Sequence, residues 1–188
     1  VYDARALAEL RGNRYKSQRA ACNRFVRAHR FRYEPYEERY REPCLDLYRK
    51  WAMQKEARGA DSVAKMMLED SAGAHHAVLT TGRQLGLIGR VVWMDDVLAA
   101  YTFGYFRTSC VFCVLVEIAD RSIAGLASYL FREFCREAYE QGATVINTLD
   151  DSGLEALGRS KQSYHPVRMI RNYIASTSLA GWNILTDQ

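Results

Sequence analysis

Apolar and polar positions follow two different periods along the chain, and the change between them divides the sequence. Up to residue 86, apolar residues recur every three to four positions or so, as on one face of an amphipathic helix. From Leu87 onward, short apolar runs bounded by turn residues are typical of strands. Helices are expected at residues 14–29, 36–57, 61–68, 77–85, 125–141 and, more briefly, 154–161. Strands are expected at residues 31–34, 87–93, 97–106, 110–119, 143–147 and 167–175.

The order of these elements predicts the fold class. The strands 87–93 and 97–106 are separated only by Met94-Asp95-Asp96, which indicates a hairpin, and the next strand extends it into an antiparallel meander. A helix then leads to a further strand, so we expect an α+β fold with a mixed, mostly antiparallel sheet flanked by helices. The regular strand–helix alternation and the glycine-rich phosphate loops of nucleotide-binding α/β proteins do not occur.

Length and composition fit one soluble domain. A chain of 188 residues with 48% hydrophobic and 26% charged residues is long enough to bury a core. The longest mostly apolar stretch, Val97–Phe106, is far shorter than the roughly 18 residues of a membrane span. No signal peptide is recognisable, which favours a cytoplasmic protein. Because the chain begins with Val1 rather than methionine, we expect it to be a fragment of a longer protein.

The net charge of +4 conceals an asymmetry. Residues 1–32 carry nine basic and two acidic residues, a charge of +7, which leaves −3 for the rest of the chain. A polyanion is therefore expected to meet the protein at its N-terminal end. The alternative is that the arginines of the helix 14–29 form only a solvated face. The apolar stripe of that helix consists of Tyr15, Cys22, Phe25, Val26 and His29.

The cysteines and histidines do not predict a metal site. Five cysteines, an odd number without close spacing, indicate free buried thiols in a reducing compartment. Cys110 and Cys113 have the spacing of half a metal site, but such positions on a strand point to opposite faces, so both are expected in the core. The adjacent His75 and His76 point in different directions on a helix, so no clustered ligand set forms.

The segment from Ile146 to Val167 has an unusual density of polar side chains directly after a predicted strand. Loops at strand ends commonly hold functional residues, where basic groups contact anions and tyrosine or histidine exchanges protons. A purely structural loop is the alternative, with Asp151 or Ser152 as an N-cap and Gly153 at a special backbone angle. The candidates are Asn147, Asp150, Asp151, Arg159, Lys161, Ser163, Tyr164 and His165.

Two motifs resemble the phosphatidylglycerol lysyltransferase C-terminal domain family. The family pattern Asn-x-Glu-x-Asp-x-Gly, followed by Gly-Leu-Arg-Lys-x-Lys-x-Ser-Tyr-x-Pro, resembles the polar segment. The matching residues are Asn147, Asp151, Gly153, Lys161, Ser163, Tyr164, His165 and Pro166, with Arg159 in place of a lysine. The family pattern Gly-x-x-Tyr-x-x-Lys-Arg-Asn-x-x-x-x-Phe resembles the N-terminal helix. The matching residues there are Gly12, Tyr15, Arg19 and Phe25.

The sequence departs from these patterns at several positions. Leu149 stands where the family has a glutamate, which removes an acid from the loop and leaves Asp150 as the neighbouring substitute. The other departures are Ala156-Leu157-Gly158 for Gly-Leu-Arg, Gln18 for a lysine and Ala20 for an asparagine.

The resemblance implies a fold and a division of the chain. Members of the family have the GNAT acyltransferase fold, usually as two tandem halves, and this chain is similar to the second half. Residues 1–32 would be the basic connecting helix segment, and residues 33–188 the GNAT-like domain. The other half would lie upstream, or a homodimer partner would replace it, with the site in a cleft between the halves.

The resemblance also implies a reaction. The co-substrate would be an aminoacyl-tRNA or an acyl-CoA rather than a tightly bound cofactor. The acceptor would be an amine or a lipid, including an anionic lipid that the bacterial-like, cytoplasmic protein meets peripherally at a membrane. The strand 110–119 would hold the acyl carbonyl, and the turn Ser122–Ala127 resembles a weakened acyl-CoA phosphate turn. The implied catalytic residues are Asp151, Tyr164 and His165. The implied donor-binding residues are Asn147, Arg159, Lys161, Ser163, Arg121, Gly125 and Arg19.

Three hypotheses of different classes follow. The first is an acyl or aminoacyl transferase. The second is a non-catalytic basic module that binds RNA or anionic lipid, which the loss of the family glutamate at Leu149 favours. The third is a half-domain whose site is completed by a partner chain.

Overall fold

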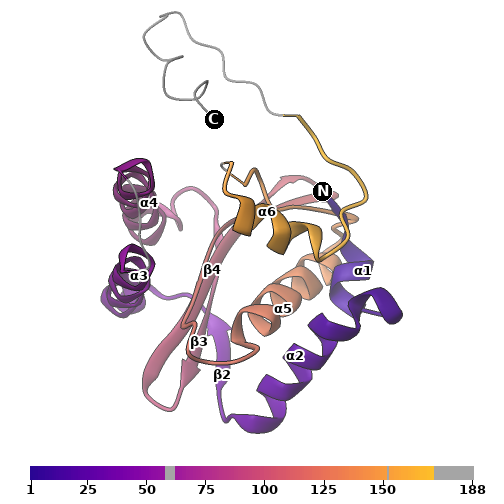
Figure 1. The fold of residues 1–188 in the computed structure, drawn as a ribbon, viewed down its shortest axis with the longest axis horizontal. Coiled ribbons are helices and arrows are strands. Elements are labelled where there is room, and N and C mark those ends of the chain that lie inside the picture. The colour runs from indigo at the N-terminus through magenta and orange to yellow at the C-terminus, as the bar shows by residue number, and fades with distance from the viewer. Residues whose placement is uncertain (58–61, 152, 172–188) are drawn as a thin grey trace, which may run out of the picture.

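A mixed sheet lies at the centre of the computed structural model, which describes residues 1–57, 62–151 and 153–171 (Figure 1). Within these residues the strand order is β1-β6-β5-β4-β3-β2. The strands are β1 (Tyr2–Asp3), β2 (Arg32–Pro35), β3 (Ile88–Met94), β4 (Val97–Thr108), β5 (Val111–Ala119) and β6 (Val145–Asn147). The helices are α1 (Ala4–Glu9), α2 (Lys16–Ala28), α3 (Arg41–Glu56), α4 (Ser62–Thr81), α5 (Leu126–Glu140) and α6 (Glu155–Gln162), with 3₁₀ turns at Asn13–Tyr15 and Glu38–Tyr40.

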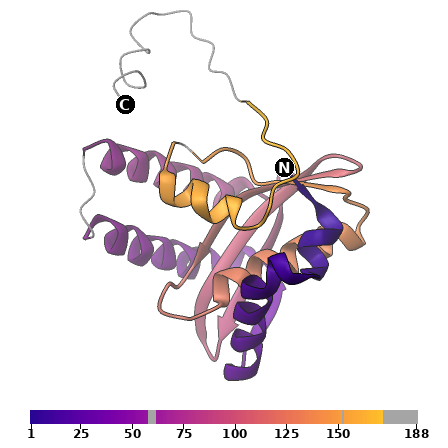
Figure 2. The same cartoon turned by 45° about the vertical axis from the view of Figure 1, so that its right-hand side comes forward.

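The sheet confirms the predicted fold class. Strands β3, β4 and β5 form an antiparallel meander, β2 pairs antiparallel with β3 at its outer edge, and the turn at Asp95 and Asp96 joins β3 to β4 as expected. The β5–β6 pair is parallel, because α5 crosses over the sheet between them. The result is a mixed, mostly antiparallel sheet with helices on both faces (Figures 1 and 2).

The helices form two layers. α3 and α4 cover one face of the sheet, while α1, α2 and α5 cover the other, and α6 is drawn above α5 in both views (Figures 1 and 2). α5 buries one apolar stripe, including Leu126, Leu130 and Phe134, at helical spacing. Leu7 of α1 and Phe25 of α2 are buried on the same side. Residues 1–32 therefore share a core with α5. The predicted boundary between a connecting segment, residues 1–32, and a GNAT-like domain, residues 33–188, stays a prediction.

A β-bulge in β5 changes which side chains face α5. Val114 pairs with Gly104 and Val116 with Phe103, so Leu115 is the extra residue. Before the bulge, Val114 packs in the cluster that includes Phe134 of α5. After the bulge, Ile118 packs with α3 and α4, while Ala119 packs with α5. By strand alternation, Glu117 lies on the α5 side with Ala119.

Several element predictions are corrected. One helix, α4, replaces the helices expected at 61–68 and 77–85, because Leu68, His75 and Leu79 form one buried face across the polar stretch between them. β1 and α1 were not predicted, since both are very short. In the expected strand 167–175, residues 167–171 are not a strand, and the remainder lies outside the described residues.

Two burial predictions are also wrong. Cys110 is exposed in the turn before β5, whereas Cys113 is buried as expected together with Cys22, Cys44 and Cys135. Val26 was placed on the apolar stripe of α2, but it is 45% exposed because Cys22 and Phe25 make the contacts with the core.

Candidate functional site

The parallel strands β5 and β6 pair briefly and then diverge. Val111, Phe112 and Cys113 pair with Val145, Ile146 and Asn147. β5 continues to Ala119 with β4 on its other side, so from Val114 onward its second edge has no neighbouring strand in the described part of the chain. Backbone groups on an unpaired strand edge are available to a ligand.

The turn between β5 and α5 lies at the far end of this open edge. Gly125 is the N-cap of α5 with φ of +86°, and a Cβ atom there would lie 2.3 Å from the carbonyl oxygen of Ala21. Glycine is therefore needed for the close packing of α2 against the start of α5. A cavity of about 270 Å³ lies beside the turn. Its lining residues are Ala119, Asp120, Arg121, Ile123, Ala124, Gly125, Ala127 and Ser128.

The turn combines free amides with one fixed carboxylate. Within the described residues, the backbone N–H groups of Ala124 and Gly125 donate no hydrogen bond, as is common at a helix start. The carboxylate of Asp120 accepts hydrogen bonds from the amide and the hydroxyl of Ser122 at 2.9 and 2.6 Å. Burial raises the pKa of Asp120, but Lys50, 2.6 Å away, and Ser122 outweigh this effect and hold that pKa below its ordinary value.

Lys161 of α6 shapes the polar loop that follows β6. Its ammonium group donates to the carbonyl oxygens of Thr148 at 2.7 Å, Leu149 at 3.4 Å and Asp150. The side chain of Asn147 accepts a 3.0 Å hydrogen bond from the amide of Leu149, which has a left-handed φ of +59°. Burial lowers the pKa of Lys161, and the nearby aspartates of the loop oppose that shift. Lys161 and Asn147 thus position the loop backbone.

Asp151 and Arg159 contact their own segment. One carboxylate oxygen of Asp151 accepts a 3.2 Å hydrogen bond from the amide of Gly153. The other oxygen faces Gly158 of α6, where a Cβ atom would lie only 3.0 Å away. Gly158, which replaces a family arginine, therefore lets α6 approach this carboxylate. Arg159 forms an exposed ion pair with Glu155, one turn away on α6.

The segment after α6 docks on the N-terminal end of α2 and so joins the two motifs. The side-chain amide of Gln18 donates a 2.6 Å hydrogen bond to the carbonyl oxygen of Ser163. The hydroxyl of Tyr15 donates to the carbonyl oxygen of Tyr164 at 3.3 Å. A ring nitrogen of His165 lies 2.9 Å from the carbonyl oxygen of Arg14. Polar and backbone groups from both motifs therefore form one packed junction.

The predicted catalytic residues do not meet at one point. The ring of Tyr164 packs edge-on against Phe131 at 4.8 Å, and burial raises the pKa of this phenol well above its ordinary value. The ring of His165 is exposed and packs against Tyr15 at 5.4 Å. Among the described residues, no contact joins either ring to Asp151. Asp151 therefore lies in the loop before α6, whereas Tyr164 and His165 follow α6, and the three side chains have different surroundings.

Arg19 and Ser163 also make local contacts. The guanidinium group of Arg19 donates to the carbonyl oxygens of Leu10 and Gly12, which follow α1. This arrangement caps the C-terminal end of α1 and positions it against α2. The hydroxyl of Ser163 donates a 2.7 Å hydrogen bond to the carbonyl oxygen of Ser160. Arg121, by contrast, is exposed at the cavity beside Gly125.

Glu117 was not singled out in the sequence, although it is the one charged residue of β5. The oxygen Oε2 of this residue is buried and has no hydrogen-bond partner, and no described residue forms an ion pair with the carboxylate. Burial raises the pKa of Glu117 to about 8. An acid within the otherwise apolar run Val111–Ala119 was the signal that could have identified it.

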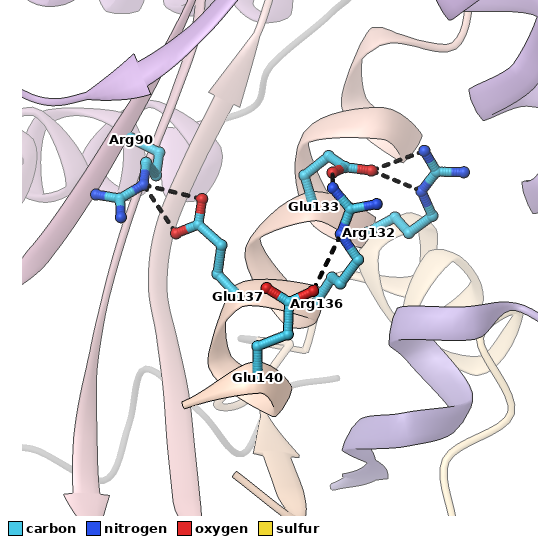
Figure 3. Close-up of polar contacts among 6 residues, drawn as sticks. All are labelled: Arg90, Arg132, Glu133, Arg136, Glu137 and Glu140. Carbon is cyan, nitrogen blue, oxygen red and sulfur yellow. Dashed lines mark hydrogen bonds and ion pairs between the residues drawn. The ribbon is translucent and has the colours of Figure 1, made fainter. Parts of the chain in front are cut away.

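The basic residues of α5 are neutralised within the fold (Figure 3). Glu133 is 4% exposed and accepts two hydrogen bonds from Arg132 at 2.9 and 2.7 Å, and it also pairs with Arg136. Arg90 of β3 pairs with Glu137 at 2.8 Å and so links the sheet to α5. Each carboxylate therefore compensates a guanidinium charge beside α5, and removal of one partner would leave a buried charge without compensation.

A family model described as "Phosphatidylglycerol lysyltransferase, C-terminal" matches residues 1–176. The chain belongs to this family. The match includes α2, β5, the loop after β6 and α6, so it contains both motifs and the junction between them. The resemblance expected from the sequence is confirmed.

Solved structures place the family member within the GNAT fold. A conserved protein of unknown function from Bacteroides thetaiotaomicron is 30% identical with a TM-score of 0.78, over 89% of this chain and 55% of that one. The C-terminal domain of a putative lysylphosphatidylglycerol synthetase from Agrobacterium fabrum is 16% identical with a TM-score of 0.53, over 88% and 54%. The chain thus spans about half the length of each.

A third structure links this fold to a known acyltransferase architecture. The aminoglycoside N-acetyltransferase AAC(6')-Iy, solved in complex with CoA, is 14% identical with a TM-score of 0.55, over 78% of this chain and 94% of that one. The likeness confirms the GNAT-like fold class. A comparison with curated proteins found no match.

The described residues contain neither a metal-ligand cluster nor a membrane-spanning helix. In the ranges 1–57, 62–151 and 153–171, no group of three or more histidine, cysteine or acidic residues is arranged to hold a metal ion. The helices in those ranges include none with the length and apolarity to span a membrane.

Proposed function

We propose that this chain is an acyltransferase domain that transfers an aminoacyl group from aminoacyl-tRNA to an anionic lipid acceptor. The observation that carries the proposal is the family match over residues 1–176, which contains both motifs. The open edge of β5 beside the α5 turn supplies a place where a donor carbonyl can meet backbone amides.

The surface of α2 supports a nucleic-acid donor. Among the described residues, Lys16, Arg24 and Arg27 of α2, and Arg30 just after the helix, have no acidic partner, unlike the arginines of α5. Arg24 and Arg27 line a broad depression of about 610 Å³ together with Ala20, Asn23 and Ala28. Uncompensated guanidinium groups along one helix suit successive phosphates of a polyanion.

Acyl-CoA is the second candidate donor. The free amides of Ala124 and Gly125, with Arg121 at the same cavity, favour it because they suit a pyrophosphate. The carboxylate of Asp120 opposes it, since it already accepts the amide hydrogen of Ser122, which a pyrophosphate at this turn would need. We therefore place aminoacyl-tRNA first.

We further propose that the complete site needs a second half. The chain spans 55% of the Bacteroides protein and 54% of the Agrobacterium protein, which leaves room in each for another domain. Either such a domain or a second copy of this chain would cover the open edge of β5.

Calorimetry with two donors tests the proposal. Wild-type protein is titrated with a non-hydrolysable aminoacyl-tRNA analogue and with acyl-CoA. We expect the tRNA analogue to bind, and the double variant Arg24→Glu, Arg27→Glu to bind it at least about tenfold more weakly, with a shallower salt dependence. The matched control is the double variant Arg83→Glu, Arg107→Glu, which makes the same charge change on exposed residues elsewhere.

The outcomes separate the candidates. If acyl-CoA binds and the tRNA analogue does not, acyl-CoA takes the place of aminoacyl-tRNA as the donor. If both double variants lose tRNA binding to the same extent, α2 is not the surface that contacts the tRNA. Binding of neither donor would overturn the transferase proposal.

A further inference from the structure

Asp120 follows β5 in the turn that leads to α5, and each of its polar atoms makes a hydrogen bond or an ion pair. Its backbone amide donates to the carbonyl oxygen of Ala99 at 2.8 Å, and its own carbonyl oxygen accepts from the amide of Ile123 at 3.2 Å. Oxygen Oδ1 accepts the amide and hydroxyl hydrogens of Ser122, and oxygen Oδ2 accepts from the ammonium group of Lys50. The carboxylate therefore has one fixed position in the turn.

Lys50 reaches this turn from the opposite layer of helices. It belongs to α3, which covers the other face of the sheet from α5 (Figure 1). Its ammonium group lies 2.6 Å from Oδ2 of Asp120, although the side chain of Lys50 is 55% exposed. An ion pair with such an exposed partner adds little stability to a fold. The ammonium group would be free to contact a ligand if the carboxylate were absent.

The carboxylate of Asp120 does not cap α5. Gly125, the N-cap of this helix, has no side chain to satisfy the first amides. In the part of the chain that the structure describes, the amides of Ala124 and Gly125 donate no hydrogen bond, although carboxylates are favourable at a helix start. Asp120 bonds Ser122, three residues before the N-cap. An Asx turn alone is the structural alternative, and it predicts no change in ligand affinity when Asp120 is replaced.

A pyrophosphate at this turn would need more donors than the turn leaves free. The adjacent amides of Ala124 and Gly125 can meet one phosphate group, and Arg121 is exposed at the same cavity. The next donors are the amide and hydroxyl of Ser122 and the ammonium group of Lys50. All three already donate to the carboxylate, which therefore takes the place that a second phosphate group would need.

We propose that Asp120 excludes acyl-CoA from this site, because its carboxylate holds Ser122 and Lys50, which would otherwise complete a pyrophosphate-binding turn. The inference rests on the proposed function, in which aminoacyl-tRNA is the donor, and it assigns the selection between the two donors to one side chain. Replacement of Asp120 by a residue without an acceptor should therefore increase the affinity for CoA.

The test measures CoA binding by calorimetry with the protein that carries this chain. Asp120→Ala releases both Ser122 and Lys50, whereas Asp120→Asn keeps an oxygen for Ser122 and releases only Lys50. The double variant Asp120→Ala, Lys50→Met removes the released ammonium group again. The matched control is Glu37→Ala, which also removes one acidic side chain and releases Arg39 at an exposed site after β2.

Two ligands separate binding of the pyrophosphate from binding of the thiol arm. CoA contains the pyrophosphate, and pantetheine has the same thiol arm without it. We expect Asp120→Ala to bind CoA at least about tenfold more tightly than wild type, and Asp120→Asn about threefold more tightly. Adding Lys50→Met to Asp120→Ala should remove part of the gain. Pantetheine affinity should stay the same in all variants, and Glu37→Ala should bind both ligands as wild type does.

Four results would overturn the selection by Asp120. They are wild-type CoA affinity equal to that of Asp120→Ala, an equal gain for pantetheine, an equal gain in Glu37→Ala, and a full gain that persists with Lys50→Met. If Asp120→Ala does not fold, Asp120→Asn decides, and a CoA affinity no higher than that of wild type overturns the inference.

The aminoacyl-tRNA analogue is titrated into the same samples. Binding of the analogue to wild type, without any gain in CoA affinity in the Asp120 variants, would overturn this inference alone. No binding of the analogue to wild type would overturn the donor of the proposed function, whatever the Asp120 variants do with CoA.

Discussion

The side-chain amide of Gln18 donates a 2.6 Å hydrogen bond to the backbone carbonyl of Ser163, 145 residues further along the chain. This bond joins the N-terminal motif on α2 to the motif after α6. The residue is a lysine in the family pattern, so glutamine keeps a donor at this position without a charge. Together with Tyr15 and Tyr164, it fixes the segment after α6 on the α2 layer.

Replacement of Gln18 should loosen this junction. Gln18 is 9% exposed, so Gln18→Ala leaves the carbonyl of Ser163 unsatisfied in a partly buried place. We expect the free energy of unfolding to fall by about 1 kcal/mol, measured by urea denaturation. Gln84→Ala, on an exposed turn, is the control and should have no measurable effect. Equal stability of the two variants would contradict a role for this bond.

Lys161 should hold the loop after β6. Lys161→Met keeps the aliphatic stem but removes the donor to the carbonyls of Thr148, Leu149 and Asp150. We expect a loss of about 1 to 2 kcal/mol in the free energy of unfolding and faster amide exchange at Leu149. Lys55→Met is the control for loss of a lysine charge elsewhere. Unchanged exchange at Leu149 would show that the loop does not depend on Lys161.

The pair of His75 and Tyr101 should make stability depend on pH. The ring of His75 lies 2.8 Å from the hydroxyl of Tyr101 and is buried, and burial lowers the pKa of His75 from 6.5 to about 4. The unfolded chain therefore binds this proton at higher pH than the folded chain, so the stability contributed by His75 falls as pH drops from 6.5 to 4 and is constant above that range. The loss has an upper limit of about 3 kcal/mol.

Chemical denaturation across this pH range provides the measurement for His75. His75→Gln should remove the fall in stability that His75 causes between pH 6.5 and 4, whereas His76→Gln, on the exposed side of α4, should keep it. An identical slope in both variants would rule out His75 as the cause.

Glu117 should have the opposite pH dependence. Burial raises its pKa from 4.5 to about 8, so the folded state keeps the proton at higher pH than the unfolded state. Stability contributed by this group is therefore present below pH 4.5 and is lost as pH rises to 8. Glu117→Gln should stabilise the protein at pH 8 by more than about 1 kcal/mol and have little effect at pH 4.5. A variant less stable than wild type at pH 8 would contradict an unpaired carboxyl.

The sheet and α5 were predicted well from the sequence because their apolar residues recur at regular strand and helix spacing. Leu126, Leu130 and Phe134 recur at helical spacing, and the Asp95-Asp96 turn separates two apolar runs. α4 was divided in two because its middle is polar, and its buried face depends on a histidine that bonds a tyrosine of the sheet. That contact is tertiary and has no local pattern.

The candidate site was predicted less completely. The motifs located Asn147, Lys161 and Tyr164, but they could not indicate that Lys161 bonds three backbone carbonyls. Arg19 was expected at a donor, which stays a prediction, and the sequence did not indicate that it also caps α1, a helix too short to predict. Glu117 was missed because the bulge at Leu115 changes the face on which it lies, and strand alternation alone does not reveal a bulge.

The most direct test of the account is transfer of a radiolabelled aminoacyl group from aminoacyl-tRNA to lipid. The protein that carries this chain is incubated with phosphatidylglycerol vesicles, and phosphatidylcholine vesicles serve as the uncharged control. We expect label in the phosphatidylglycerol fraction only, with loss of transfer in the Arg24→Glu, Arg27→Glu variant. Absence of labelled lipid with wild-type protein, from either aminoacyl-tRNA or acyl-CoA, would contradict it.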